Sequence, residues 1–423
     1  MTTALPRRLG LAAAVTIGAG SMIGAGVFSA WSPAVAASGT GVLIGLLIAA
    51  VVAFCNATSS AQLAAVHPES GGTYVYARHR LGPFWGHVAG WGFVVGKVAS
   101  CAAMALTAGS YLAPEHTRLV AVTAVCGVAI VNIGGLTRTV AVTRWILACS
   151  LLALVAVVIA GWSSPAASIE RLSPIDGSPT GILRAAGFLF FAFAGYARIA
   201  TLGEEVRDPS TTIPAAIPRA LAGVLVVYAV VGVTLLATVP VAAVAASDAP
   251  LELVVAASSF DRLAPVVRIG AGVAALGVLL NLVPGISRTV LAMARRDELP
   301  TFLAHVDGRR SVPLRAEVLV TAVVVVLTAT LDLRGAIGVS GVLVLTYYAI
   351  TNAASLRLRP GERRWPRWIA ITGLVGCVVL AVMLPLAAVV SAAAILLAGI
   401  VVRSVRRSGG LAHPGAVRNR GGA

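Results

Sequence analysis

The chain has 423 residues, of which 58% are hydrophobic and only 11% are charged, whereas charged residues make up about a quarter of an ordinary soluble domain. This composition excludes a water-soluble globule. The 32 basic and 16 acidic residues give a net charge of +16, but they lie in short breaks between long apolar runs and form no basic stripe, so they indicate membrane orientation and not nucleic-acid binding.

Twelve apolar segments are each about long enough to cross a bilayer as a helix, which takes roughly 20 residues. They run from 9–36, 41–66, 84–113, 119–136, 145–162, 181–203, 213–240, 263–294, 314–332, 336–356, 368–384 and 386–403. The first is too long and too rich in glycine for a cleaved signal peptide, so we expect it to be retained as a span. The residues from 408 to 423 have no apolar period and are predicted to be a disordered tail.

The loops between these segments predict the orientation, because cytoplasmic loops concentrate Lys and Arg. With the N-terminus inside, most of the basic residues fall in cytoplasmic loops. We therefore expect a multi-pass protein of the cell membrane, with residues 1–8 and the tail 408–423 both cytoplasmic and the lipid bilayer as its surroundings.

The first segment contains a cluster of four glycines, at positions 18, 20, 24 and 26. Each glycine weakens a helix by about 1 kcal/mol relative to alanine, and unwound backbone at this depth must be buried in protein or line a cavity. One interpretation is a broken helix. The other is a small-residue packing face, since Gly20 and Gly24 form a GxxxG pair.

A second interruption lies in the sixth segment, where Gly195 follows a cluster of aromatic residues at 190, 191 and 193 and precedes one further aromatic residue, Tyr196. The two interruptions are five segments apart. Interrupted segments at corresponding positions of two halves are the best sequence indication of a midplane site in a transporter built from inverted repeats. This spacing favours broken helices in both segments.

Three sets of motifs resemble those of the amino acid permeases of the amino acid, polyamine and organocation (APC) superfamily. They are GSMIGAGVF at 20–28, the sixth segment continuing into GEEVRDP at 203–209 and IP at 213–214, and SR at 287–288 with AMAR at 292–295 and LP at 299–300. The resemblance implies an all-α integral membrane protein with two inverted five-helix repeats (9–162 and 181–356), two accessory spans (366–403) and broken spans one and six. It also implies secondary active transport of amino acids by alternating access.

The two breaks suggest how the ends of an amino acid are bound. The substrate carboxylate suits the free amides and positive dipole end of the outer half of span one, with Ser21, Ile23, Gly24, Ala25 and Gly26 as candidates. The ammonium suits carbonyls released at the break before Gly195, around Phe190, Phe191 and Phe193. One of these rings is a candidate gate, although any of them can equally be an ordinary packing residue.

Lys97 is the single lysine of the chain and lies near the middle of the third segment, about 20 Å from its start. An ionisable residue at that depth is by default functional, and reversible protonation is available to lysine but not to arginine. Many proton-coupled relatives carry a lysine in span five, where this chain has Cys149 or Ser150. We therefore predict that Lys97 is the proton-coupling residue; the alternative is that it snorkels or only stabilises carbonyls.

A cytoplasmic gate is the third candidate site. Glu204 and Glu205 close the sixth segment at its negative dipole end, where carboxylates are unfavourable unless they are paired. Pairing with basic residues of the neighbouring loops would remove that cost, and the candidates are Arg78, Arg80, Arg288 and Arg295. A solvated cluster of loop charges is the alternative.

The residues also constrain the substrate. No acidic residue is predicted mid-span, so a cationic side chain would lack a buried counter-charge; we expect symport of a neutral amino acid, with a proton as coupling ion. The alternatives are a polyamine or cationic amino acid carrier or exchanger and, less favoured, a channel. The five cysteines and six histidines show no metal-binding spacing, and the apolar segments lack an activated nucleophile. We therefore expect no cofactor, no metal and no enzymatic activity.

Overall fold

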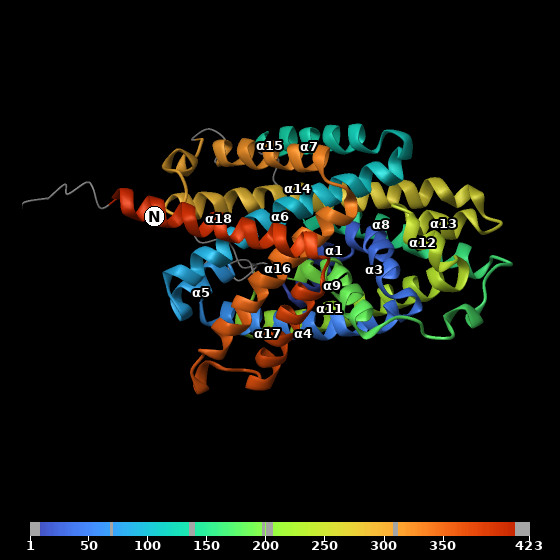
Figure 1. Ribbon diagram of the computed structural model, residues 1–423, viewed down its shortest axis with the longest axis horizontal. Coiled ribbons are helices and arrows are strands. Elements are labelled where there is room, and N and C mark those ends of the chain that lie inside the picture. The colour runs from blue at the N-terminus through green and yellow to red at the C-terminus, as the bar shows by residue number, and fades with distance from the viewer. Residues whose placement is uncertain are drawn as a thin grey trace, which may run out of the picture.

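The computed structural model describes residues 9–67, 71–134, 140–196, 199, 206–307 and 312–410. The predicted N-terminal segment 1–8, and all of the predicted tail beyond Gly410, lie outside these residues. The described residues form helices and their connections, together with two isolated bridges that join Leu9 to Val206 and Asp307 to Val312. The predicted all-α fold is therefore confirmed, and Figure 1 shows the helices packed as one bundle.

The main helices follow the chain in the order now given. They are α1 (Leu11–Met22), α2 (Ala25–Ser29), α3 (Trp31–Ser38), α4 (Val42–Val66), α5 (Thr73–Leu81), α6 (Pro83–Leu112), α7 (Thr117–Ile133), α8 (Val140–Trp162), α9 (Pro179–Phe193), α11 (Pro209–Thr238), α12 (Val241–Ala246), α13 (Pro250–Ala256), α14 (Ala264–Ala294), α15 (Leu314–Thr330), α16 (Leu333–Leu356), α17 (Arg367–Met383) and α18 (Leu386–Gly410).

Every predicted apolar segment contains helix, but the described residues hold nine helices that are both long and apolar enough to cross a membrane. The count of twelve spans is therefore not confirmed by length alone. Helices α9, α15 and α17 are shorter, because α9 stops at the break before Gly195 and α17 is bounded by Pro366 and Pro385. Three short helices, α5, α12 and α13, lie in stretches for which no span was predicted.

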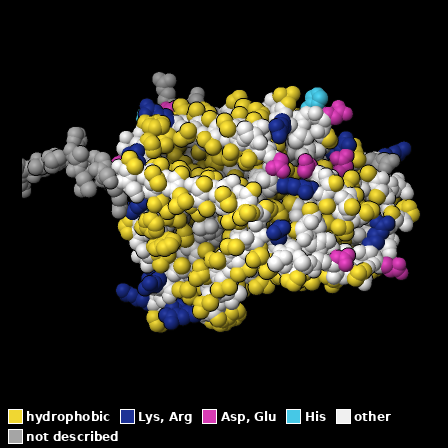
Figure 2. Space-filling view, viewed as in Figure 1, with side chains coloured by type: hydrophobic (Ala, Val, Ile, Leu, Met, Phe, Trp, Pro, Cys, Tyr) yellow, Lys and Arg dark blue, Asp and Glu magenta, His cyan; other side chains and the backbone are white. Residues whose placement is uncertain are grey.

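The helices pack in two matching sets of pairs. Helix α1 packs against α11, and α9 packs against α4; likewise α6 packs against α16, and α14 packs against α8. Helices α6 and α14 also contact each other extensively, so they form the centre of the bundle. On the face of the molecule seen in Figure 2, hydrophobic side chains form a broad band over the outer surface, as expected for a surface that contacts lipid.

Buried polar side chains tie α4 and α16 together. The Asn352 side-chain amide donates to Asn56 Oδ1 at 2.6 Å, and the Gln62 amide donates to Ser355 Oγ. All four side chains are buried. Hydrogen bonds between helices stabilise membrane proteins because an unpaired polar group in hydrocarbon is costly.

A buried carboxylate gathers three helices at the end of the bundle where α5 lies. Glu298, which follows α14, forms ion pairs with Arg78 of α5 and with Arg403 of α18, and lies 3.5 Å from Nδ1 of His87 in α6. Burial acts to raise the pKa of the Glu298 carboxyl, but the nearby His87 and Tyr74 side chains and the charge of Arg78 outweigh burial and lower the pKa. The ionised carboxylate therefore holds the ends of these helices together.

Tyr111, near the end of α6, connects two further segments. Its hydroxyl donates to the Phe28 carbonyl of α2 at 2.8 Å and accepts from the Leu251 amide of α13 at 3.2 Å. The side chain is fully buried, so removing the hydroxyl leaves two buried backbone groups without this partner.

We expect Tyr111→Phe to lower the free energy of unfolding by about 1–3 kcal/mol, the cost of leaving buried polar groups unsatisfied. Thermal unfolding of the purified protein in detergent measures this loss. Tyr76→Phe is the matched control, because Tyr76 is also buried but its hydroxyl makes no hydrogen bond to the described residues. Equal stability of the two variants would contradict the assigned role of Tyr111.

Candidate functional site

The first predicted break is present. Helix α1 ends at Met22 and α2 begins at Ala25, with Ile23 and Gly24 outside helical geometry. The Ile23 amide donates to the Ala19 carbonyl at 2.7 Å, and the Gly24 amide donates to the Met22 carbonyl at 2.8 Å. The amides of Ile23 and Gly24 therefore already have partners and are not free for a substrate, whereas the first amides of α2 lack an acceptor within their own helix, as at any helix start.

The second break is also present. Helix α9 ends at Phe193 and is followed by a single tight turn, η4 (Ala194–Tyr196), in which the Ala194 amide donates to the Phe191 carbonyl. Glu204 and Glu205, further along the chain, lie outside the described residues.

The two breaks are in direct backbone contact. A side chain at Gly195 would collide with the Ser21 carbonyl, and a Cβ at Gly26 would lie 2.6 Å from Cα of Ala192. Both glycines therefore permit a close approach that any larger residue prevents. The contact brings the end of α1 and the start of α2 against the end of α9.

Tyr228 of α11 joins the two breaks by hydrogen bonds. Its buried hydroxyl lies 2.6 Å from the Met22 carbonyl and 3.0 Å from the Ala192 carbonyl. A second tyrosine, Tyr348 of α16, donates to the Ala194 carbonyl at 3.4 Å. The carbonyls released by the breaks are thus met by tyrosine hydroxyls from neighbouring helices.

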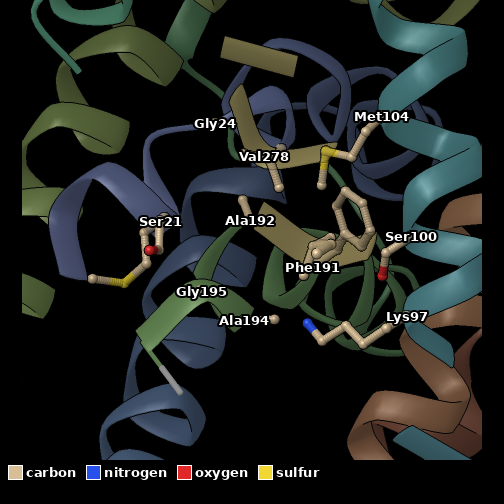
Figure 3. A pocket seen from close by; sticks show the side chains of 13 residues that line it. Ser21, Gly24, Lys97, Ser100, Met104, Phe191, Ala192, Ala194, Gly195 and Val278 are labelled. Carbon is tan, nitrogen blue, oxygen red and sulfur yellow. The ribbon is translucent and has the colours of Figure 1, made fainter. Parts of the chain in front are cut away.

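A cavity of about 40 Å³ lies where the breaks meet α6 and α14. Figure 3 shows Phe191 reaching into it between the two helices, with Ser100 and Met104 of α6 and Val278 of α14 around it. The lining residues are Ser21, Met22, Gly24, Gly26, Lys97, Ser100, Met104, Phe191, Ala192, Ala194, Gly195, Val278 and Leu282. The walls are mostly apolar, with few polar groups placed at the breaks, which is typical of a small-molecule site.

Lys97 contributes the positive charge of this cavity. Its side chain is 8% exposed and extends from α6 towards Ala194 at the second break (Figure 3). Among the described residues, no hydrogen bond or ion pair to its ammonium is formed. The ammonium is therefore directed into the cavity, towards the unwound backbone at Ala194.

The structure brings together six of the predicted site residues, since Ser21, Gly24, Gly26, Phe191, Gly195 and Lys97 all line the cavity. Ile23 and Ala25 are buried at the break but do not line the cavity. Two of the three predicted rings turn elsewhere: Phe190 packs edge-on against Tyr348, and Phe193 packs against Tyr228. The Ser21 hydroxyl donates to the Ile17 carbonyl at 2.8 Å, so its hydrogen serves its own helix.

The candidate gate is described only in part. Arg288 lies on α14, is exposed and does not line the cavity. Arg78 and Arg80, two of the expected partners of Glu204 and Glu205, form ion pairs with Glu298 and Glu362. The hydrogen bond from Arg80 holds the pKa of the Glu362 carboxyl at about 2.

Sequence reasoning missed the walls that α6 and α14 supply. Ser100 and Met104 follow Lys97 at intervals of three and four residues, and Val278 and Leu282 are four apart, so each set lies on one helix face. For α6, this spacing is visible in the sequence and indicates that Ser100 and Met104 lie on the same helix face as Lys97. For α14 and for Tyr228 of α11, the sequence contains no signal that indicates the face turned to the site.

A multi-pass helical membrane protein with two broken helices that meet at a central cavity has the architecture of a secondary transporter. The family model described as "Amino acid permease" matches residues 9–402. The chain therefore belongs to the amino acid permease family and is a transporter of amino acids, not an enzyme.

Several relatives agree with this family. The chain is 56% identical over 404 residues to an uncharacterized transporter of Mycobacterium tuberculosis, a match that covers 95% of this chain and 92% of the relative. It is 23% identical to the branched-chain amino acid permease BcaP of Bacillus subtilis, covering 88% and 84% of the two chains. It is 27% identical to the aromatic amino acid transport protein AroP of Escherichia coli O157:H7, covering 75% and 72%.

The contact between Gly24 and Val278 gives a test of the first break. A Cβ at Gly24 would collide with a methyl group of Val278, so we expect Gly24→Ala to destabilise the protein by about 1–3 kcal/mol through overpacking. Adding Val278→Ala to the same chain removes the collision and should restore most of the lost stability. Thermal unfolding of the single and double variants measures the effect.

Gly223→Ala is the control, because a Cβ at this α11 glycine meets nothing within 4 Å. A Val278→Ala substitution that fails to compensate for Gly24→Ala would show that the break does not pack against α14 as described.

Proposed function

We propose that the protein carries a neutral amino acid across the cell membrane by alternating access, coupled to protons, with Lys97 as the coupling residue. The observation that supports this most is the direction of the Lys97 ammonium, which reaches towards Ala194 at the second break from an otherwise apolar wall. A proton gained or lost at this place changes the charge beside both the backbone of the broken helix and the contents of the cavity.

The two breaks offer complementary groups to the two ends of an amino acid. The first amides of α2, at Ala25 and Gly26, suit the carboxylate, because helix N-termini favour negative charge. The carbonyls of Ala192 and Ala194 suit the ammonium. Each already accepts one tyrosine hydroxyl, and a carbonyl oxygen has a second lone pair for another donor.

The remaining wall favours a neutral side chain of small or medium size. Phe191, Met104, Val278 and Leu282 are apolar, and no carboxylate is among the described residues that line the cavity. A cationic side chain there would lie near Lys97 without a counter-charge, and an unpaired buried ion costs several kcal/mol. The relatives named for branched-chain and aromatic amino acids are compatible with this proposal, and a relative named as a cationic amino acid transporter supports the alternative.

The packing pattern supports two inverted repeats, 9–162 and 181–356. If each span of the first repeat is exchanged with the span five places further along, the contact of α1 with α11 becomes that of α9 with α4, and the contact of α6 with α16 becomes that of α14 with α8. We also propose that both termini are cytoplasmic, because Arg78, Arg80 and Arg403 lie at one end of the bundle. Glu204, Glu205 and Arg288 remain our candidates for a gate at that end.

Replacing Lys97 tests the coupling. Lys97→Met keeps the bulk of the side chain without its charge, and Lys97→Arg keeps a charge that is not released. We expect both variants to exchange substrate in proteoliposomes but to lose accumulation driven by a pH gradient, with sodium dispensable throughout.

The matched control is Ser110→Ala, which removes a buried polar group from the same helix away from the cavity. The Ser110 hydroxyl donates to the Leu106 carbonyl within α6 and does not line the cavity, so this variant should still accumulate substrate with the gradient. Gradient-driven accumulation that persists in Lys97→Met, or in Lys97→Arg alone, would contradict reversible protonation of Lys97.

Competition for uptake tests the charge of the substrate. We expect unlabelled neutral amino acids to displace the best neutral substrate more effectively than lysine or putrescine, because the described lining of the cavity offers no carboxylate. A tenfold lower inhibitory concentration for lysine or putrescine, equivalent to about 1.4 kcal/mol of preference, would make the cationic carrier the better proposal.

A further inference from the structure

Glu317 is a second buried carboxylate and takes no part in the ion pairs of Glu298. It lies in the first turn of α15 with a fully buried side chain. Its two oxygens have no hydrogen-bond partner among the described residues, and nearby the Asn132 amide nitrogen of α7 and the Thr321 hydroxyl of α15 are also buried without one. Glu317 stands near the start of the predicted apolar segment 314–332, and the fold closes α7 and α14 over it.

The groups that face Glu317 come from all three helices. Asn132 of α7 and Ser287 of α14 lie close enough to interact with the carboxyl but do not meet hydrogen-bond geometry. The Ser287 hydroxyl donates its hydrogen to the Val283 carbonyl at 2.9 Å. While the hydroxyl donates to Val283, it can accept a hydrogen bond from Glu317 but cannot donate one to it.

Among the residues that the structure describes, the charges around Glu317 do not compensate an ionised carboxylate. On α14, Arg288 acts on it only at longer range and has an exposed side chain. On α15, Arg315 is directed at the Phe302 carbonyl. On α7, Arg118 lies at the opposite end of the helix and bonds to Ala329, and Cys126 is exposed. Within the described ranges, no basic side chain forms an ion pair with Glu317.

An ionised carboxylate with neither a cation nor hydrogen bonds is very costly in such an interior. A protonated carboxyl fits the same surroundings, because its O–H can donate to Ser287 Oγ and its carbonyl oxygen can accept from the Asn132 amide. We propose that Glu317 is a proton-binding site between α7, α14 and α15. It holds a proton in the conformation described here and releases it to water when these helices separate.

This site is separate from the central cavity, which Glu317 does not line. It adds a carboxyl to the proposed proton-coupled function but does not require Lys97 to be the coupling residue, nor the substrate to be neutral. Its test therefore needs a measurement that involves neither substrate nor transport.

The first measurement is infrared spectroscopy of the purified protein as a function of pH. We expect the carbonyl stretching band of a protonated carboxylic acid at neutral pH, shifted on exchange into D₂O and absent from Glu317→Gln. Glu362→Gln is the control, because Glu362 is a solvent-accessible ion-pair partner of Arg80, and this variant should keep the band. A band that is missing from the wild type at neutral pH, or unchanged in Glu317→Gln, would overturn the proposal.

The second measurement is thermal unfolding in detergent between pH 5 and 8. The folded protein holds a proton that the unfolded chain releases, so folding binds more protons and stability falls as the pH rises. In the wild type, we expect the folding equilibrium constant to fall as the pH rises. This fall should be up to about tenfold per pH unit steeper than in Glu317→Gln, whose side chain has the shape of the protonated carboxyl but no proton to release. Identical slopes for these two proteins, with the slope of Glu362→Gln like that of the wild type, would contradict a proton on Glu317.

Discussion

The main physical constraint on this protein is that backbone groups freed by a helix break within a membrane must find partners inside the protein. The hydroxyl of Tyr228 supplies such a partner at both breaks. Helix α1 stops at Met22 and α9 stops at Phe193, and each leaves carbonyls without the next turn of helix. Because the Met22 and Ala192 carbonyls share one hydroxyl, the two ends must lie together. The contacts at Gly26 and Gly195, and the cavity beside them, follow from that arrangement.

The same constraint explains why the cavity has its particular polarity. Tyrosine hydroxyls donate to the carbonyls of Ala192 and Ala194, and the Lys97 side chain extends towards Ala194 (Figure 3). Between them the wall is apolar, with Phe191 and Met104 near the centre. In our proposal, the backbone atoms of the breaks recognise the ends common to all amino acids, and side chains of α6 and α14 shape the space for the variable part of a substrate.

The sequence was sufficient to predict the long helices, the two breaks and the position of Lys97 within a long helix, because each leaves a local signature. Glycine weakens a helix wherever it stands, and a lysine deep in an apolar run is conspicuous. The orientation of side chains was not predictable in this way. Phe190, Phe191 and Phe193 look alike in sequence, yet only Phe191 reaches the cavity, since which face of α9 turns inwards depends on α4, α11 and α16. The burial of Glu317 depends in the same way on how α7 and α14 pack over α15.

The Glu298 cluster has a consequence for the way the bundle moves. Arg78 of α5, His87 of α6 and Arg403 of α18 all converge on one carboxylate that follows α14, and separating any of them weakens the pairing of a buried charge. Moving any one of these four segments away from the others therefore weakens this buried pairing. Helix α1 takes no part in it, so a displacement of α1 leaves the Glu298 pairing intact but breaks the tie of α1 to α9 through Tyr228.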